Sequence, residues 1–153
     1  MKPSMLVAAA MAVSLSAAAA MAEDVEPAAV PFEGTAVPTA LTSTPGDPAA
    51  GAATFADRKL GNCFACHAVS SRTDELFHGN VAPPLDGVAD RWSAEELRAI
   101  VIDAKKVFGP ETVMPGFYSL DVGINVREDL VGKTILTAQE VEDVVAYLGT
   151  LKD

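Results

Sequence analysis

The sequence has 153 residues, and its 21 acidic residues against 11 lysines and arginines give a net charge of −10 with the histidines neutral. A chain of this length is sufficient for one domain with a modest core. The strong negative charge argues against binding to nucleic acid or to anionic membrane surfaces, because both would repel the protein.

The first 22 residues have the features of a secretory signal peptide. Lys2 provides a positive start, an apolar run rich in Ala, Val and Leu follows, and Ala20-Met21-Ala22 forms a small-x-small cleavage site. The alternative is a membrane anchor, which needs about 20 strongly apolar residues, but this run is short and Ala-rich. We therefore expect export and cleavage after Ala22. The mature chain of 131 residues would have a charge of −11, because Lys2 is the one charged residue removed.

Residues 23–46 are predicted to form an extended arm. The segment has few large apolar residues and no helical or strand periodicity, and its four prolines disfavour regular structure; these are Pro27, Pro31, Pro38 and Pro45. Two interpretations remain open, a disordered leader or an arm that lies along a partner chain.

A first helix is expected from Asp47 to about Lys59 at the start of a domain that spans 47–153. Asp47 is a good N-cap, and Pro48 suits the first helical position. Gly61 and Asn62 favour the end of the helix. The residues expected on its inner side are Gly51, Phe55 and Leu60.

Two further amphipathic helices are expected, from Ser93 to about Lys106 and from Thr137 to about Leu151. Each begins with a capping box, formed by Ser93 with Glu96 and by Thr137 with Glu140. Apolar residues recur at helical spacing in both; they are Leu97, Ile100, Val101 and Ala104 in the former and Val141, Val144, Val145, Leu148 and Leu151 in the latter.

The segments between the helices, residues 68–91 and 109–136, are expected to be loops, with a short strand pair around Ile124 and Ile135. The fold class is therefore all-α, with three main helices, long loops and an extended N-terminal arm. Three helices make a thin core for a chain of this length, so an internal staple is expected.

Both cysteines, Cys63 and Cys66, lie in the stretch GNCFACHAV, residues 61–69, and His67 follows at once. Three interpretations compete. A zinc site needs further ligands, and His78 is the one other histidine. A thioredoxin-like redox pair needs a strand before the motif and a helix after it, whereas here a helix precedes it.

The third interpretation is covalent attachment of haem c by the pattern C-x-x-C-H, and we favour it. The thiols of Cys63 and Cys66 would add to the two vinyl groups of one haem. The imidazole of His67 would then bind the iron from the same side as the attachment. The apolar faces of the haem would also complete the thin core between the three helices.

Met114 is the expected second axial ligand of the iron. The other four methionines all precede residue 23, and Met114 lies in a loop that Pro115 and Gly116 stiffen. The alternatives are an adaptable core residue at Met114 and ligation by His78, which follows His67 by only 11 residues. Ligation by His67 and Met114 fills both axial positions and therefore suits electron transfer.

Pro83, in the stretch APPLDG, has two interpretations. Its carbonyl oxygen is placed to accept a hydrogen bond from Nδ1 of His67, which would fix the imidazole ring. The alternative is an ordinary loop proline.

Most of residues 47–153 resembles class I cytochrome c. The resemblance rests on Gly51 and Phe55 in the first helix, Pro83-x-Leu85-x-Gly87, Met114-Pro115, and Tyr147-Leu148 in the last helix. It implies three main helices around one covalently bound haem c. The attachment residues would be Cys63 and Cys66, with His67 and Met114 as axial ligands and Pro83 as the partner of His67.

The chain resembles more closely the SoxX family, the small monohaem subunits of the SoxAX cytochromes of bacterial thiosulfate oxidation. The stretches that carry this resemblance are FHGNVAPPL (77–85), VMPGFY (113–118) and LTAQEVEDVVAYLGTL (136–151). The resemblance implies a periplasmic heterodimer with a SoxA-like cytochrome, and transient contacts with a SoxYZ-like carrier and a small electron-acceptor cytochrome.

In such a complex, an L-cysteine S-thiosulfotransferase, thiosulfate is coupled oxidatively to a cysteine of the carrier protein. The resemblance implies that the substrate chemistry occurs on the SoxA-like subunit. The present chain would accept the electrons, with no catalytic residue and no substrate site of its own.

Two other functions remain open. One is a free-standing shuttle cytochrome that donates electrons to an oxidase or photosynthetic centre, for which the arm and the long 118–136 segment are unneeded. The other is a haem enzyme or ligand sensor, in which Met114 is a core residue.

Overall fold

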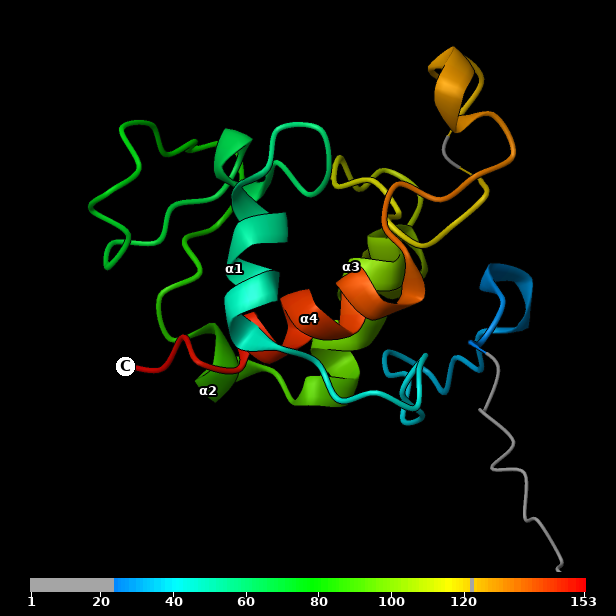
Figure 1. Cartoon of the computed structure of the whole chain (residues 1–153), viewed down its shortest axis with the longest axis horizontal. Helices are drawn as coiled ribbons and strands as arrows, with labels where there is room; N and C mark the ends of the chain where they lie inside the picture. The colour runs from blue at the N-terminus through cyan, green and yellow to red at the C-terminus, as the bar shows by residue number, and fades with distance from the viewer. Residues whose placement is uncertain (1–23, 122) are drawn as a thin grey trace, which may run out of the picture.

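The computed structural model describes residues 24–121 and 123–153, and within them the fold is all-α, which confirms the predicted fold class (Figure 1). The predicted signal peptide lies outside the described residues. The elements in chain order are η1 (Pro27–Ala29), α1 (Pro48–Ala56), η2 (Cys63–Ala65), α2 (Val88–Arg91), α3 (Ala94–Phe108), η3 (Glu128–Leu130) and α4 (Ala138–Leu148). In this part of the chain no helix is both long and apolar enough to cross a membrane.

Helix α1 begins as predicted but ends three residues before Lys59. The side chain of Asp47 caps it by accepting a hydrogen bond from Ala49 N at 2.8 Å. Asp57 then adopts an extended conformation, and its carboxylate accepts the amide of Lys59 at 2.7 Å. The local carboxylate therefore competes with the helical hydrogen bonds, as short acidic side chains do.

The capping boxes of α3 and α4 are confirmed. In α3, Ser93 N donates to Glu96 Oε2 at 2.9 Å, and Glu96 N donates to Ser93 Oγ at 3.3 Å. In α4, Thr137 and Glu140 form the same reciprocal pair at 2.7 and 3.2 Å. Helix α4 ends at Leu148, because the amides of Thr150 and Leu151 donate to carbonyls three residues earlier and the chain tightens into turns.

The predicted strand pair around Ile124 and Ile135 is wrong. Neither residue lies in a strand, and the side chain of Ile124 is fully exposed. Gly123 and Gly132 both have positive φ, 113° and 71°, which breaks any extended run between them. In the described ranges, β-pairing amounts to one isolated bridge between Glu33 and Ala36.

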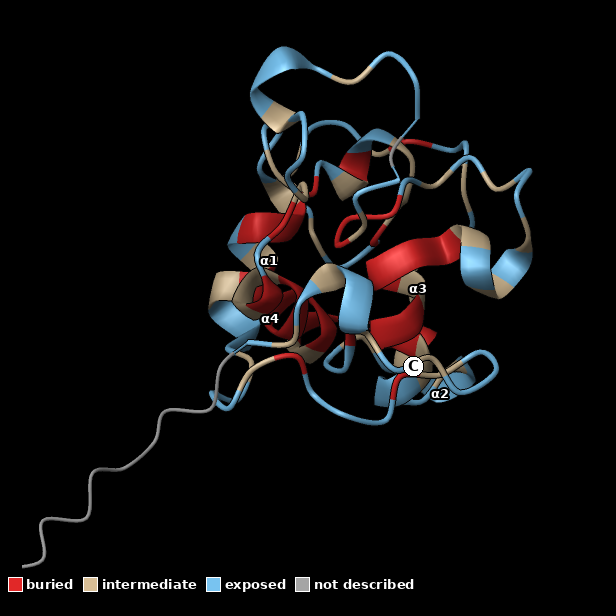
Figure 2. Ribbon diagram, turned by 90° about the vertical axis from the view of Figure 1, so that its right-hand side faces the viewer, coloured by how far each residue is buried: buried red, intermediate tan, exposed pale blue. Residues whose placement is uncertain are grey.

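Helix α4 packs against both α1 and α3, and the buried residues concentrate on these three helices (Figure 2). At the crossing of α1 with α4 the two backbones touch. A Cβ added to Gly51 would lie 1.9 Å from the carbonyl oxygen of Asp143, so only glycine fits there. One turn later Phe55 is buried, with its ring edge-on to Tyr147 at a centroid distance of 5.3 Å.

The N-terminal arm lies along this chain's own helices α3 and α4. The side chains of Val37 and Leu41 are at most 1% exposed and join the core. The amide of Val37 donates to the carbonyl of Glu95 at 3.0 Å, and the amide of Asp47 donates to the carboxylate of Asp143 at 2.8 Å. The arm is therefore packed onto the helices without forming a long regular element.

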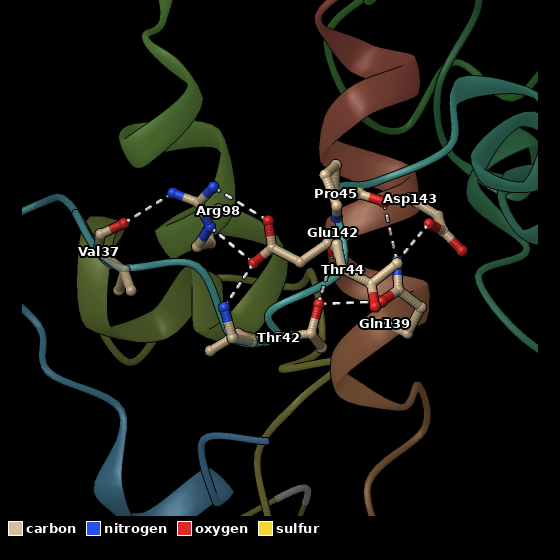
Figure 3. Close-up of polar contacts among 9 residues, drawn as sticks. Val37, Thr42, Thr44, Pro45, Arg98, Gln139, Glu142 and Asp143 are labelled. Atoms are coloured by element: carbon tan, nitrogen blue, oxygen red, sulfur yellow. Dashed lines mark hydrogen bonds and ion pairs between the residues drawn. The ribbon is translucent and has the colours of Figure 1, made fainter. Parts of the chain in front are cut away.

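A buried ion pair joins α3, α4 and the arm (Figure 3). Arg98 donates from Nε and Nη2 to the two carboxylate oxygens of Glu142, at 2.8 and 3.0 Å. The third guanidinium nitrogen, Nη1, donates to the carbonyl of Val37 at 2.9 Å, and Leu41 N donates to Glu142 Oε1 at 2.9 Å. Both charges are nearly fully buried, and each guanidinium nitrogen and each carboxylate oxygen has a hydrogen-bond partner, as buried charges require.

Replacing Glu142 with Leu is expected to lower the free energy of unfolding by about 3–5 kcal/mol, because it leaves the Arg98 guanidinium buried without a counter-charge. The double variant Arg98→Met/Glu142→Leu is expected to be more stable than Glu142→Leu, since no buried charge remains. Denaturant unfolding of the haem-loaded protein measures both values. Arg127→Ala breaks the exposed pair of Arg127 with Asp129 and should change stability little. A double variant less stable than Glu142→Leu would contradict the explanation that the unpaired, buried charge of Arg98 causes the loss of stability.

Candidate functional site

The C-x-x-C-H motif forms a tight turn after α1. Asn62 adopts the left-handed conformation (φ 47°), and residues Cys63–Ala65 form η2. The carbonyl of Cys63 accepts the amides of Cys66 at 3.1 Å and His67 at 2.9 Å. Side chains three residues apart are eclipsed in such a turn, so the thiols of Cys63 and Cys66 leave the chain on one side. Both are free thiols and half-buried.

The loop that follows the motif folds back over it. Gly79 N donates to Phe64 O at 2.8 Å, and Ala82 N donates to Cys66 O at 3.0 Å. A Cβ added to Gly79 would lie 2.2 Å from the carbonyl oxygen of Ala65, so the two backbones are in direct contact. The turn that presents the cysteines is therefore held from behind by the chain itself.

The ring of His67 is oriented by Pro83. Nδ1 of His67 lies 2.8 Å from the carbonyl oxygen of Pro83, the contact that one interpretation of the sequence expected. A carbonyl only accepts, so Nδ1 carries the proton in this hydrogen bond. In the neutral ring Nε2 then holds a lone pair, as an iron ligand requires. The side chain thus fits the axial role toward a haem attached at Cys63 and Cys66.

The loop that carries Pro83 is in turn fixed by polar contacts. Arg91 donates to the carbonyls of Pro84 at 3.1 Å and Asp86 at 2.6 Å. The carboxylate of Asp86 accepts from the hydroxyl and amide of Ser70 at 2.7 and 2.9 Å, and these hydrogen bonds hold the pKa of Asp86 below its usual value. Sequence analysis did not identify these residues as support for His67.

His78 uses both ring nitrogens within the protein. Its Nδ1 accepts the amide of Val69 at 3.3 Å, and its Nε2 donates to the carbonyl of Arg72 at 3.2 Å. The ring also stacks on Phe64, with a centroid distance of 4.8 Å and an interplanar angle of 25°. A neutral imidazole bonded at both nitrogens has no lone pair left for iron, so the geometry gives His78 a structural role and disfavours the ligation by His78 that the sequence left open.

Met114 lies in the loop that follows α3 and is half-buried against the core. In Figure 1 this loop (yellow) and the turn after α1 are at the same end of the helix assembly. The loop is tied down just after Met114. The amides of Phe117 and Tyr118 donate to the carbonyls of Val101 and Ile102 in α3, at 3.2 and 3.1 Å. The thioether is therefore presented from a part of the chain separate from the cysteines.

A further contact joins this loop to the N-terminal arm. The hydroxyl of Tyr118 donates to the carbonyl of Val25 at 2.8 Å, and burial raises the pKa of Tyr118, as do the charges of Glu26 and Asp24 nearby. The arm thus reaches the loop of Met114, which sequence analysis did not anticipate.

The two other interpretations of the cysteines gain no support from the geometry. Burial raises the pKa of the Cys63 thiol to about 12, and the neighbouring Cys66 adds to the rise. Such a thiol stays protonated at neutral pH, whereas a redox-active cysteine needs a depressed pKa. Within residues 24–121 and 123–153, no group of three or more His, Cys, Asp or Glu side chains is arranged to hold a metal ion.

Comparison with known proteins places these features in a family. Residues 48–152 match the family model described as "Cytochrome c". The chain is also similar to a chain of the crystal structure of SoxXA from P. pantotrophus, with 42% sequence identity and a TM-score of 0.78. That match covers 85% of this chain and 99% of the other. No curated protein matched.

The matched region contains helices α1 to α4 and the residues predicted to hold the haem: the two thiols of the C-x-x-C-H turn, His67 with its Pro83 partner, and Met114. Members of the matched family bind haem c covalently and transfer electrons. The chain therefore belongs to the cytochrome c family.

Proposed function

We propose that the chain is the electron-transfer subunit of a periplasmic SoxAX-like complex that couples thiosulfate to a carrier-protein cysteine. The observation that carries the proposal is the extent of the match to the SoxXA chain. The cytochrome c family match spans residues 48–152, whereas 85% of 153 residues is about 130. The likeness to the SoxXA chain therefore includes part of the arm before residue 48, which a free-standing shuttle would not need.

The chain's residues would hold one haem c in the following way. Cys63 and Cys66 would attach it through thioether bonds, His67 and Met114 would bind the iron, and the carbonyl of Pro83 fixes the ring of His67. The haem supplies one-electron chemistry, and methionine as second ligand favours the reduced iron. With both thiols used for attachment and two side chains bound to the iron, this chain would offer thiosulfate neither a thiol nor the iron, and it would take no part in sulfur transfer.

The remaining roles belong to partners. A SoxA-like cytochrome would carry the substrate chemistry, a SoxYZ-like carrier would supply the accepting cysteine, and a small cytochrome would take the electrons. This division of labour makes the chain a subunit of an L-cysteine S-thiosulfotransferase and leaves it without catalytic residues. The likeness to SoxXA supports the first of these partners most directly.

The loop beside the C-x-x-C-H turn is our candidate for the partner surface. Leu76 is fully exposed, and Phe77 and Val81 are 64% and 69% exposed. Asp74 and Glu75 precede them and are both paired with Arg72, at 3.0 and 3.4 Å, and the same loop contacts the motif through Gly79 and Ala82. Exposed apolar residues on such a loop favour a partner with an apolar patch of its own.

Replacing Met114 with Ala in the haem-loaded protein is expected to abolish the near-infrared Met-to-Fe(III) charge-transfer band. The reduction potential should fall by on the order of 0.1 V, within the roughly 0.8 V range that axial ligands span. Absorption spectroscopy and redox titration measure the two effects. His78→Gln is the matched control and should retain the band. Because Met114 is the one methionine after residue 22, a spectrum that Met114→Ala leaves unchanged and His78→Gln alters would exchange the two assignments.

A tagged copy of the chain, purified from thiosulfate-grown cells, is expected to bring down an untagged second cytochrome. The double variant Leu76→Ser/Phe77→Ser should weaken this association at least tenfold, because it removes apolar contact area from the interface. Val131→Ser changes a residue on another loop that is as exposed as Phe77, at 64%, and should have little effect. A chain that remains strictly monomeric in these lysates would favour the shuttle function instead.

A further inference from the structure

Helix α3 is interrupted at Asp103. This residue has φ −156° and ψ 92° inside an element that is otherwise helical from Ala94 to Phe108. Interruptions of this kind usually occur at proline or glycine, but the local sequence is AIVIDAKKVF. Asp103 is also 7% exposed, which is unusual for an acidic residue. The contacts of Asp103 therefore account for the break.

The carboxylate of Asp103 replaces the hydrogen bonding that the break removes. In a continuous helix the amide of Lys105 would donate to the carbonyl of Val101, four residues earlier. Here Lys105 N donates to Asp103 Oδ1 at 3.2 Å, so Asp103 acts as an N-cap for the last turn of α3. The carbonyls of Val101 and Ile102 are consequently released from the helix.

The released carbonyls bind the loop that carries Met114. Val101 O and Ile102 O accept the amides of Phe117 and Tyr118, at 3.2 and 3.1 Å. The side chains of Phe117 and Tyr118 are 7% and 6% exposed, so these hydrogen bonds belong to a buried contact. In a continuous helix the same carbonyls would accept hydrogen bonds from amides of the helix itself.

The loop lies directly on the break. A Cβ added to Gly116 would be 2.8 Å from Cβ of Ser119 and 3.2 Å from both Cγ of Asp103 and the carbonyl oxygen of Ile102, all tighter than ordinary packing. On the other side of Met114, Nζ of Lys105 donates to the carbonyl of Thr112. The loop is thus tied to α3 on both sides of Met114, within two or three residues of it.

We propose that Asp103 is a positioning residue for Met114: its carboxylate stabilises the break in α3, and the break provides the backbone acceptors that hold the Met114 loop toward the haem iron. Asp103 does not itself touch the iron or its ligands in this role. The inference rests on the proposed ligation by Met114. It predicts that the requirement at position 103 is for a short side-chain oxygen that accepts a hydrogen bond, with or without a charge.

The test compares haem-loaded Asp103→Ala, Asp103→Asn and Asp121→Ala with the unchanged protein. Asp121→Ala removes an exposed acid close to the same loop and is the control for charge. Two quantities are measured: the Met-to-Fe(III) charge-transfer band and the affinity of the oxidised protein for added imidazole, which competes with Met114. In Asp103→Ala we expect imidazole to bind roughly tenfold more tightly and the band to weaken. The reason is that loss of the helix cap weakens the hold on the Met114 loop, so imidazole displaces Met114 more easily. Asp103→Asn and Asp121→Ala should keep both properties.

Unchanged imidazole affinity and an unchanged band in Asp103→Ala would overturn the proposal, and so would an Asn variant that behaves like the Ala variant. If Asp103→Ala yields no folded haem protein, Gly116→Ala replaces it. That variant places a methyl group against Asp103 and Ile102, and an unchanged affinity there would also overturn the proposal.

Met114→Ala, measured in parallel, separates this inference from the proposed ligand set. If Met114→Ala loses the band while Asp103→Ala keeps it with unchanged imidazole affinity, only the role of Asp103 fails. If the unchanged protein lacks the band, or if Met114→Ala leaves its spectrum unaltered, the ligation fails, and the role of Asp103 fails with it.

Discussion

The close approach of α1 to α4 is the constraint on which the rest of the structure depends. Gly51 lies in α1 and contacts the carbonyl of Asp143, and Gly46, just before α1, contacts the carbonyl of Glu142. No side chain fits at either glycine. Because α4 also packs on α3, this contact fixes where two loops begin. The turn with the two cysteines follows α1, and the loop with Met114 follows α3, so the helix packing determines the separation of the two halves of the site.

The two halves are held by backbone contacts of different kinds. On the cysteine side, the chain folds back on itself, and the carbonyl of Pro83 fixes the ring of His67. On the methionine side, amides of the Met114 loop donate hydrogen bonds to the carbonyls of Val101 and Ile102, next to the break in α3. In the proposed ligand set, both ligands would thus be held by backbone contacts, and such preorganisation suits electron transfer better than substrate binding.

The arm and the buried ion pair extend this framework toward the N-terminus. Arg98 and Glu142 bring three segments together, and the arm covers the helices on the face where these residues lie. The arm then contacts the Met114 loop through Tyr118 and Val25. The exposed apolar residues Leu76 and Phe77, in contrast, lie on the loop beside the cysteines. The two sides of the site thus differ, since one is supported by the arm and the other is open to a partner.

The sequence by itself determined the features that depend on near neighbours. The capping boxes at Ser93 and Thr137 predicted two helix starts, because a cap involves residues only three positions apart. The spacing of Cys63, Cys66 and His67 indicated haem attachment for the same reason, since all three reach one haem from a single turn. The family match later confirmed the cytochrome c fold that these patterns predicted.

The tertiary structure alone decided the features that join distant segments. Arg98 and Glu142 are 44 residues apart, and no local pattern pairs them. The break at Asp103 is coupled to a loop beyond it, whose amides bind the carbonyls of Val101 and Ile102. Helical periodicity carries no information about that loop and predicted a continuous helix there. The arm was predicted without contacts to its own helices, and a strand pair was predicted near Ile124, because local propensity does not report what another part of the chain covers. These choices follow from packing and from hydrogen bonds over long sequence distances, which only the folded chain brings together.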